Sequence, residues 1–289
     1  MKVFTAEKAG FCFGVKRALT VIHELHRNGK TIRTFGPLIH NNAVLRNLEQ
    51  KGIRSISELK GICGKETLVL RTHGVSKRAE NQLKRKGVPY VDATCPLVKK
   101  THQIIEKLDP KATRIVLVGD PSHPEIMASK SYAGRVTVLN SLKEARAFPR
   151  SKKISVIAQT TLDLEFFKRI VAVLRKKAES VDIHNTVCAA TRERQDAIRR
   201  LAGEVDFVVV IGGRNSSNTR KLYWIAKKRN PHSYHVETHQ ELSKPAFIKR
   251  IRDFHTVGIT AGASTPLQEI AQARKFFQRL HREKEMTHV

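Results

Sequence analysis

Short apolar runs alternate along the chain with longer stretches whose apolar residues recur every three or four positions. The short runs are typical of buried strands, and the periodic stretches are typical of helices with one apolar face. The runs predict strands at residues 67–71, 88–92, 114–118, 153–158, 206–211 and 256–260. The periodic stretches predict helices at residues 15–26, 97–108, 163–177, 191–201, 220–228 and 267–281. Strands that alternate with helices indicate an α/β protein with mainly parallel sheets.

Three of the four cysteines stand at comparable points of this pattern. Cys12, Cys95 and Cys188 each follow a short extended stretch and precede a predicted helix, at similar separations along the chain. A chain of 289 residues is longer than one compact core usually serves. We therefore expect three α/β units of similar size. Each would present one cysteine at the carboxyl edge of its sheet, where open α/β sheets bind ligands.

The fourth cysteine, Cys63, lies in a glycine-bounded loop and breaks this spacing, so we interpret it as a bystander. No apolar run approaches the ~18 residues that a membrane span needs, and the first residues lack the apolar core of a signal peptide. We expect a cytoplasmic protein with no membrane partner. In that compartment its cysteines would serve as metal ligands or catalytic groups rather than in disulfides.

The charge balance narrows the classes of partner. The chain has 54 lysines and arginines against 26 aspartates and glutamates, a formal net charge of +28. Such a charge suits nucleic acid, an anionic small substrate or an acidic protein partner. The basic residues are spread along the chain and form no long basic tail, so each cluster by itself is typical of a solvated helix face.

Polar residues with useful chemistry occur in six loops between predicted strands and helices. They are His40, Asn41, His73, His123, Glu125, Thr160, Ser216, Ser217, Asn218, Thr219, Ser264 and Thr265. Taken singly, such residues are usual N-caps or structural hydrogen-bonding groups. Together, hydroxyls, an amide, histidines and helix N-terminal N–H groups suit a phosphate or diphosphate. His123 and Glu125 form a titratable pair, and in an extended stretch residues two apart face the same side.

Three cysteines leave two kinds of metal centre open. Zinc is held by three cysteines and a histidine in some structural sites. Iron–sulfur clusters usually take four thiolates, so three thiolates on a cubane would leave one iron open to a substrate. An open iron is both a Lewis acid and an electron conduit, which suits the reductive removal of an oxygen substituent.

Nine stretches carry a resemblance to a known family. In chain order they read AGFCFGVKRA, GPLIHN, RTHGV, DATCP, HPE, AQTTL, TVCAATRERQ, GGRNSSNT and AGASTP, and they run from residue 9 to residue 266. Together and in this order they resemble the 4-hydroxy-3-methylbut-2-enyl diphosphate reductase family, which catalyses the last step of the non-mevalonate isoprenoid pathway.

The resemblance implies a fold and a cofactor. The fold is three small α/β domains arranged pseudo-threefold around a central iron–sulfur cluster. The domains would span residues 13–94, residues 95–187, and residues 188–289 together with 1–12. The cofactor is a [4Fe-4S] cluster with three cysteine ligands, which correspond to Cys12, Cys95 and Cys188.

The resemblance also implies a substrate site and a reaction. Its diphosphate pocket corresponds to His40, His73, Ser216, Ser217, Asn218 and Ser264. The positions around the substrate hydroxyl correspond to His123, Glu125 and Thr160, with Glu125 as the proton donor. The implied oxidoreductase removes the hydroxyl with two electrons and yields isopentenyl and dimethylallyl diphosphate.

The sequence holds no GxGxxG fingerprint for a flavin or nicotinamide, so electrons would come from an external donor such as ferredoxin or flavodoxin. The resemblance implies no nucleic-acid partner. The rival interpretation is a basic RNA-binding protein with a structural metal site.

The chain departs from the family pattern in two loops. Asn42 and Ala43 stand where the family more often has proline and glutamine, and Ala128 stands where glycine is common. Both changes concern the local shape of a loop and neither touches an implied catalytic residue. The net charge of +28 and Cys63 are further features that the family did not lead us to expect.

Overall fold

The computed structural model describes residues 1–59 and 66–287, so the prediction that Cys63 is a bystander lies outside the described residues. The chain forms two compact units. Unit 1 comprises Met1–Cys12, His40–Arg46 and Ala189–Val289, and unit 2 comprises Phe13–Ile39 and Asn47–Cys188. In the described ranges the strands form three sheets of four parallel strands, which confirms the predicted α/β class. No helix in the described part is long and apolar enough to cross a membrane.

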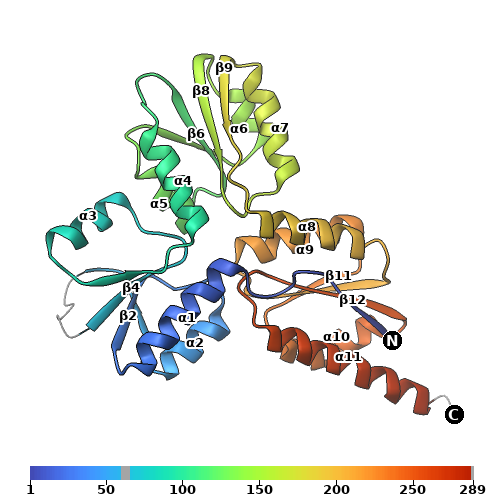
Figure 1. The fold of residues 1–289 in the computed structure, drawn as a ribbon. Helices are drawn as coiled ribbons and strands as arrows, with labels where there is room; N and C mark the ends of the chain where they lie inside the picture. Colours follow the sequence, from blue (N-terminus) through green and yellow to red (C-terminus); the bar gives the residue numbers. More distant parts are fainter. Residues whose placement is uncertain (60–65, 288–289) are drawn as a thin grey trace. The chain divides into compact units, whose positions relative to one another are not determined.

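Unit 1 holds one sheet with strand order β1-β12-β10-β11 (Figure 1). Its strands are β1 (Lys2–Thr5), β10 (Phe207–Ile211), β11 (Ser233–Val236) and β12 (Thr256–Ala261). Its helices are α8 (Ala189–Leu201), α9 (Ser217–Arg229), the short 3-10 helix η1 (His239–Ser243), α10 (Pro245–Ile251) and α11 (Leu267–Thr287). Helix α2 (Asn42–Gln50) begins in the sequence of unit 1 and ends in that of unit 2.

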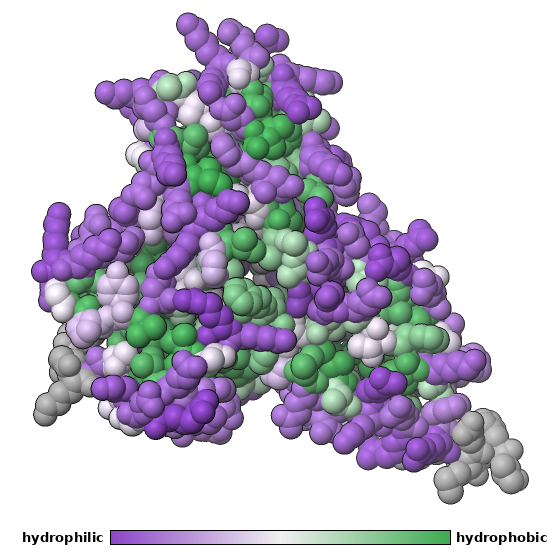
Figure 2. All heavy atoms as spheres, viewed as in Figure 1, coloured by the Kyte–Doolittle hydropathy of each residue, from purple (hydrophilic) through white to green (hydrophobic). Residues whose placement is uncertain are grey.

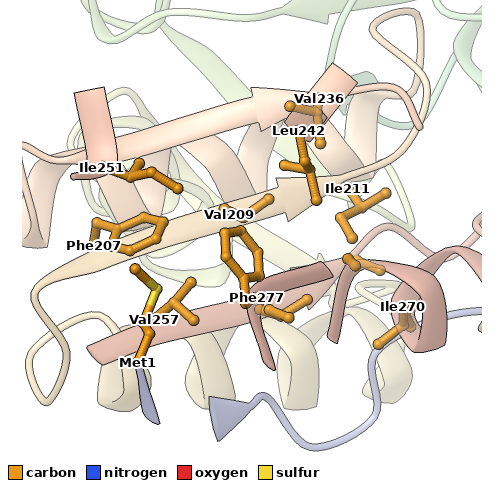
Figure 3. Packing of buried hydrophobic residues seen from close by; sticks show 13 residues of the cluster. Met1, Phe207, Val209, Ile211, Val236, Leu242, Ile251, Val257, Ile270 and Phe277 are labelled. Atoms are coloured by element: carbon orange, nitrogen blue, oxygen red, sulfur yellow. The ribbon is translucent and has the colours of Figure 1, made fainter. Parts of the chain in front are cut away.

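Alternate residues of β10 explain why helices cover both faces of this sheet. Phe207, Val209 and Ile211 pack in one cluster with Phe277 of α11 (Figure 3). The intervening Val208 and Val210 pack with α8 and α9 on the opposite face. Because successive side chains of a strand point to opposite faces, a strand covered on both sides reads as the unbroken apolar run FVVVI.

Unit 2 holds two sheets, with strand orders β3-β2-β4-β5 and β7-β6-β8-β9. The first is built from β2 (Thr31–Phe35), β3 (Arg54–Ile56), β4 (Glu66–Leu70) and β5 (Tyr90–Asp92), and the second from β6 (Arg114–Val118), β7 (Val136–Leu139), β8 (Ser151–Ala158) and β9 (Ala178–His184). The helices are α1 (Phe13–Arg27), α3 (Lys77–Arg85), α4 (Pro96–Lys107), α5 (Pro124–Lys130), α6 (Leu142–Ala147) and α7 (Leu164–Arg175).

Helix starts in unit 2 follow from local chemistry. Ser141 and Glu144 form a reciprocal capping box at α6, and the Asp163 carboxylate accepts from the Phe166 N–H at the start of α7. Hydrophilic side chains cover most of the surface that is in view in Figure 2, as the polar faces of these helices require.

The three sheets repeat one connectivity. In each, a strand that leads to a cysteine (β5, β9 or β1) lies at an edge and pairs with a second strand (β4, β8 or β12), which pairs with a third (β2, β6 or β10). The expected set of three units that each present one cysteine is therefore confirmed at the level of sheet topology. The domain boundaries at 13–94, 95–187 and 188–289, and the pseudo-threefold arrangement about a common centre, remain predictions.

The predicted strands are mainly the central ones. Residues 67–71, 114–118, 153–158, 206–211 and 256–260 correspond to β4, β6, β8, β10 and β12, and only 88–92 corresponds to an edge strand, β5. Edge strands such as β3 and β11 are covered less completely, so their sequences are more polar. The apolar pattern also misses the central strand β2, because its sequence TIRTF contains a charged residue. This residue, Arg33, pairs with Glu66 of the neighbouring strand at 2.8 Å.

Helix α4 carries a buried histidine, His102, which is 5% exposed. Burial lowers the pKa of His102 from 6.5 to about 4, against the opposing influence of Glu80, Asp92 and Glu106. The side chain is therefore neutral in the folded protein at pH 7.

This buried histidine predicts an acid-sensitive stability. At a pH above 6.5, the pKa of His102 in the unfolded chain, the side chain is neutral in both the folded and the unfolded state. Its protonation then takes nothing from the free energy of unfolding. As the pH falls toward 4, the unfolded state binds a proton that the folded state excludes, so the free energy of unfolding falls, by about 1 kcal/mol at a pH of about 5.5. Urea unfolding followed by circular dichroism at a pH of about 7.5 and about 5.5 should show a smaller loss in His102→Gln than in the wild type. Equal losses would contradict the prediction, since all other histidines are common to both proteins.

Candidate functional site

Each of the three cysteines in the described part of the chain makes the same kind of backbone contact. The N–H groups of Cys95, Cys188 and Cys12 donate to the carbonyl oxygens of Thr72, Thr160 and Ala263, at 2.9, 2.9 and 3.0 Å. In each case the acceptor lies in the loop after the strand that pairs with the cysteine's own strand. Parallel strands end at the same edge of a sheet, so this bond fixes each cysteine at that edge.

In unit 2, Cys95 is the N-cap of α4, and Pro96 at the first helical position presets the helix. Gly14 lies against this thiol. A Cβ at residue 14 would lie 2.8 Å from Cys95 Sγ, so a side chain larger than hydrogen would displace the sulfur. Cys188 stands immediately before α8. Both cysteines therefore lie at helix starts.

His73 and His123 come from neighbouring loops of unit 2 and contact each other. Their rings meet edge to face with centroids 5.3 Å apart. His73 lies in the loop after β4, and His123 lies in the loop after β6. His123 is also the N-cap of α5, and its Nδ1 accepts from the N–H of Glu125 (3.2 Å).

Glu125 is a buried carboxylate, 2% exposed, in the first turn of α5. Its two oxygens accept from the N–H and the hydroxyl of Thr160, at 2.6 and 2.7 Å. The expectation that 123–125 is an extended stretch is wrong, because Pro124 occupies the first position of a helix. Glu125 is therefore aligned by Thr160, while its backbone contacts His123.

Residues of unit 2 thus form a continuous series of contacts. Thr72, beside His73, accepts from Cys95, His73 packs on His123, and Thr160 bonds both Glu125 and Cys188. The structure brings together six residues singled out in the sequence of this unit: Cys95, His73, His123, Glu125, Thr160 and Cys188.

In unit 1, a buried arginine holds the loop before Cys12. Gly10 adopts a positive φ of 93°, and the Arg194 guanidinium donates to its carbonyl at 2.7 Å. Arg194 also donates to the carbonyl of Ala190 (2.7 Å), within its own helix α8. Its position in the stretch TVCAATRERQ was visible in the sequence, but its contact with Gly10, 184 positions away, was not.

The loop that contains His40 is bound to the loop after β12 in the same unit. The Ser264 hydroxyl donates to the His40 carbonyl (3.0 Å), and the Asn41 side-chain amide donates to the Ser264 carbonyl (2.8 Å). Asn41 is 3% exposed. It was noted in the sequence as a loop residue, and the structure gives it this role of joining two loops.

The N-terminus of α9 supplies the remaining polar groups of unit 1. Ser216 is the N-cap and accepts from the Thr219 N–H, and Ser217 and Asn218 open the helix. Asn218 is 4% exposed, yet among the described residues its side-chain oxygen and nitrogen have no hydrogen-bond partner. A buried, unsatisfied amide costs free energy unless a ligand completes its bonds.

The loop before α9 is closely packed from both sides. A Cβ at Gly213 would lie 2.7 Å from the His40 carbonyl oxygen, so glycine is needed where the two loops meet. His235 Nε2 lies 2.8 Å from the Gly212 carbonyl oxygen. Burial lowers the pKa of His235, and because a carbonyl only accepts, Nε2 carries the proton of this bond. Unit 1 thus brings together Cys12, His40, Ser216, Ser217, Asn218 and Ser264.

Known proteins are similar to this chain over most of its length. The family model described as LytB protein matches residues 3–278. A curated relative from Geobacter sulfurreducens, named 4-hydroxy-3-methylbut-2-enyl diphosphate reductase, is 42% identical over 268 residues, which cover 92% of this chain and 93% of the relative. A relative of the same name from Aquifex aeolicus is 38% identical over 283 residues, 96% of each chain.

Two solved structures of reductases are also similar to this chain. One, of (E)-4-hydroxy-3-methyl-but-2-enyl diphosphate reductase, the terminal enzyme of the non-mevalonate pathway, is 38% identical with a TM-score of 0.69, and the match covers 96% of this chain and 100% of that one. Another, the E-1-hydroxy-2-methyl-but-2-enyl-4-diphosphate reductase of Plasmodium falciparum, is 27% identical with a TM-score of 0.88 over 96% of this chain and 87% of that one. The chain therefore belongs to the LytB protein family.

Proposed function

We propose that this protein is an iron–sulfur oxidoreductase that converts 4-hydroxy-3-methylbut-2-enyl diphosphate to isopentenyl and dimethylallyl diphosphate. The carbon–oxygen bond breaks, two electrons and two protons are consumed, and water leaves. The observation that carries the proposal is the repeated placement of Cys12, Cys95 and Cys188 by the same backbone bond, beside loops that hold acid–base and anion-binding groups. The names of the relatives, which are similar over more than nine-tenths of the chain, support the same reaction.

We assign Cys12, Cys95 and Cys188 as the ligands of a [4Fe-4S] cluster. All three stand at helix starts, and Gly14 leaves space beside the sulfur of Cys95, so the donor set and its surroundings suit a thiolate-bound group. A cubane with three thiolate ligands supplies single electrons and has one iron without a protein ligand. The alternative, zinc with the three cysteines and one histidine as ligands, has no support in the names of the relatives, which are those of reductases.

We assign binding of the diphosphate to six residues in strand-to-helix loops and at the start of α9: His40, His73, Ser216, Ser217, Asn218 and Ser264. The N-terminus of α9, a helix of 13 residues, directs N–H groups and a positive dipole toward an anion. The buried and unsatisfied amide of Asn218 is consistent with a ligand that completes its hydrogen bonds. The histidines add donors that strengthen when they are protonated.

We assign proton delivery to Glu125, with Thr160 and His123 as its supports. Thr160 donates two hydrogen bonds to the carboxylate and so fixes the direction in which its proton points. The Glu125 N–H donates to His123 Nδ1, so His123 caps the helix turn that carries the carboxylate. A carboxyl group held in this way can protonate the leaving oxygen of an alcohol as its bond to carbon breaks.

We further propose that electrons arrive from an acidic carrier such as ferredoxin or flavodoxin. The chain has no nucleotide fingerprint of its own, and its net charge of +28 would attract an acidic protein. The RNA-binding interpretation is not supported, because the family model and the curated relatives account for nearly the whole chain as a reductase.

The cluster assignment predicts a different outcome for each class of cysteine. Replacement of Cys12, Cys95 or Cys188 by serine should remove cluster iron or abolish activity, because a thiolate ligand is lost. Iron content and the visible spectrum of anaerobically purified protein measure this directly. Cys63→Ser is the matched control and should keep both, whereas iron loss in Cys63→Ser with retention in one of the other three would overturn the assignment.

The proton-donor assignment predicts an effect on kcat. Glu125→Gln can keep both contacts with Thr160 by reversing one of them, but it has no acidic proton. We therefore expect kcat to fall by about 10²–10⁴-fold, with KM and iron content close to wild type. His73→Ala should instead mainly raise KM. Wild-type turnover by Glu125→Gln in an anaerobic assay would mean that the proton has another source.

The charge argument predicts a salt effect that depends on the donor. Reduction by an acidic carrier protein should slow steeply as ionic strength rises, because salt screens attraction between opposite charges. Turnover with a small, uncharged mediator should change little. Parallel slopes in the two assays would remove electrostatic steering, and tight, salt-sensitive RNA binding would restore the RNA-binding interpretation.

A further inference from the structure

His102 and Tyr132 form a stacked pair in unit 2, and the sequence did not single out either residue. Their rings lie 4.1 Å apart between centroids and are tilted by 20°. His102 belongs to α4, two turns after the N-cap Cys95, and Tyr132 follows the end of α5. The pair therefore joins the helix that begins after Cys95 to the helix that carries Glu125 in its first turn.

His102 also supports the turn next to His73. Gly74 has a positive φ of 76°, and a Cβ at this residue would lie 2.6 Å from the His102 ring carbon Cε1. The backbone of the turn thus rests directly on the imidazole, and only glycine fits both the conformation and the space. Because His73 and Gly74 are adjacent, the His102 ring limits where the His73 backbone can lie.

Tyr132 binds the same loop from the other side of the stack. Its hydroxyl donates to the Val75 carbonyl (3.3 Å) or to Glu80 (3.2 Å). The neighbouring Ser131 hydroxyl accepts from the Lys77 N–H (2.9 Å), and the Lys77 ammonium lies 5.4 Å from the Tyr132 ring centre. The end of α5 is therefore fixed to the segment that follows His73.

We propose that the His102–Tyr132 pair is the positioning element that holds His73 and Glu125 in register for one substrate. This proposal rests on the function proposed above. Neither residue contacts the reacting atoms in this scheme: His102 acts through Gly74 and His73, and Tyr132 acts through α5. A displacement of about 1 Å at a catalytic group can cost on the order of 10²-fold in rate, so a buried support of this kind would be felt in turnover.

The charge state of the pair suits a packing role. Burial lowers the pKa of His102 and raises that of Tyr132, so both rings are neutral at pH 7. The charged groups around them are largely paired with one another, with Lys77 2.7 Å from Glu106 and Lys84 2.9 Å from Glu80. The stack is therefore a neutral contact beside charged groups that are paired with one another.

A double-mutant cycle tests the proposal on the iron-loaded enzyme with a small chemical reductant. His102→Ala should raise KM by roughly tenfold, with iron content unchanged, since His73 loses its support. In a His73→Ala background the same substitution should change KM by less than about twofold, because a residue that acts through another cannot act once that residue is gone. Additive effects would overturn the proposal.

Two variants separate positioning from loss of stability. Tyr132→Phe keeps the stacked ring and deletes the contact with the Val75 carbonyl, so it should give a smaller defect than Tyr132→Ala. Ile170→Ala, at a fully buried residue of α7 in the same unit, should lower Tm without any coupling to His73. Coupling of Ile170→Ala as strong as that of His102→Ala would mean that the cycle reports stability only. If His102→Ala does not fold, His102→Gln, which also removes the ring beside Gly74, takes its place in the cycle.

Amide exchange supplies a readout that does not need turnover. The Gly74 N–H donates to the Arg71 carbonyl at 3.1 Å. Mass-spectrometric exchange of the peptide that covers residues 71–76 should be faster in His102→Ala than in wild type or Ile170→Ala. If the wild type fails to reduce the substrate, the proposed function fails, but the exchange rates still decide whether the pair positions this turn. Unchanged exchange would overturn the positioning role.

Discussion

The structure depends on the constraint that parallel strands end at the same edge of a sheet. Most strands are then followed by a helix that returns the chain to the opposite edge, so each sheet collects a row of strand-to-helix loops at one edge. In this protein the row repeats three times in the same order: a cysteine, then a loop with His73, Thr160 or Ser264, then a loop with His40, His123 or Ser216. The hydrogen bond from each cysteine N–H to the neighbouring loop is the local expression of this constraint. It places the thiol relative to the polar groups without any similarity of sequence among the three repeats.

The same edge also explains how polar groups can be buried there. Helix N-termini leave N–H groups without partners within the helix, and short loops bring side chains to them. Ser216 and His123 satisfy such groups as N-caps, while Thr160 uses its N–H and hydroxyl to hold the Glu125 carboxylate. The amide of Asn218 stands out because its polar atoms remain unsatisfied among the described residues. The caps hold these loops, and Asn218 is one of the residues that we propose to bind the diphosphate.

Support for this frame comes from residues with no chemistry of their own in the reaction. Arg194 fixes the loop before Cys12, Asn41 joins the loops of His40 and Ser264, and His102 lies beneath Gly74. Each makes a contact between segments far apart in the sequence or between different helices. Side chains with this role must fit a specific distance and shape, which is why they are buried and why glycine occupies the points of closest approach.

The sequence by itself determined the α/β class, all central strands except β2, the helix starts at the cysteines and, through nine ordered motifs, the family. These features are local: an unbroken apolar run, a helical period or a short motif is complete within a few residues. Only the tertiary structure decided that Pro124 begins a helix, that β2 is a central strand although it carries Arg33, and that His102 stacks on Tyr132. Those outcomes depend on partners from other strands and helices. The free energy of burying a charge, a proline or an imidazole is set by the groups that surround it, and no local pattern of residues encodes them.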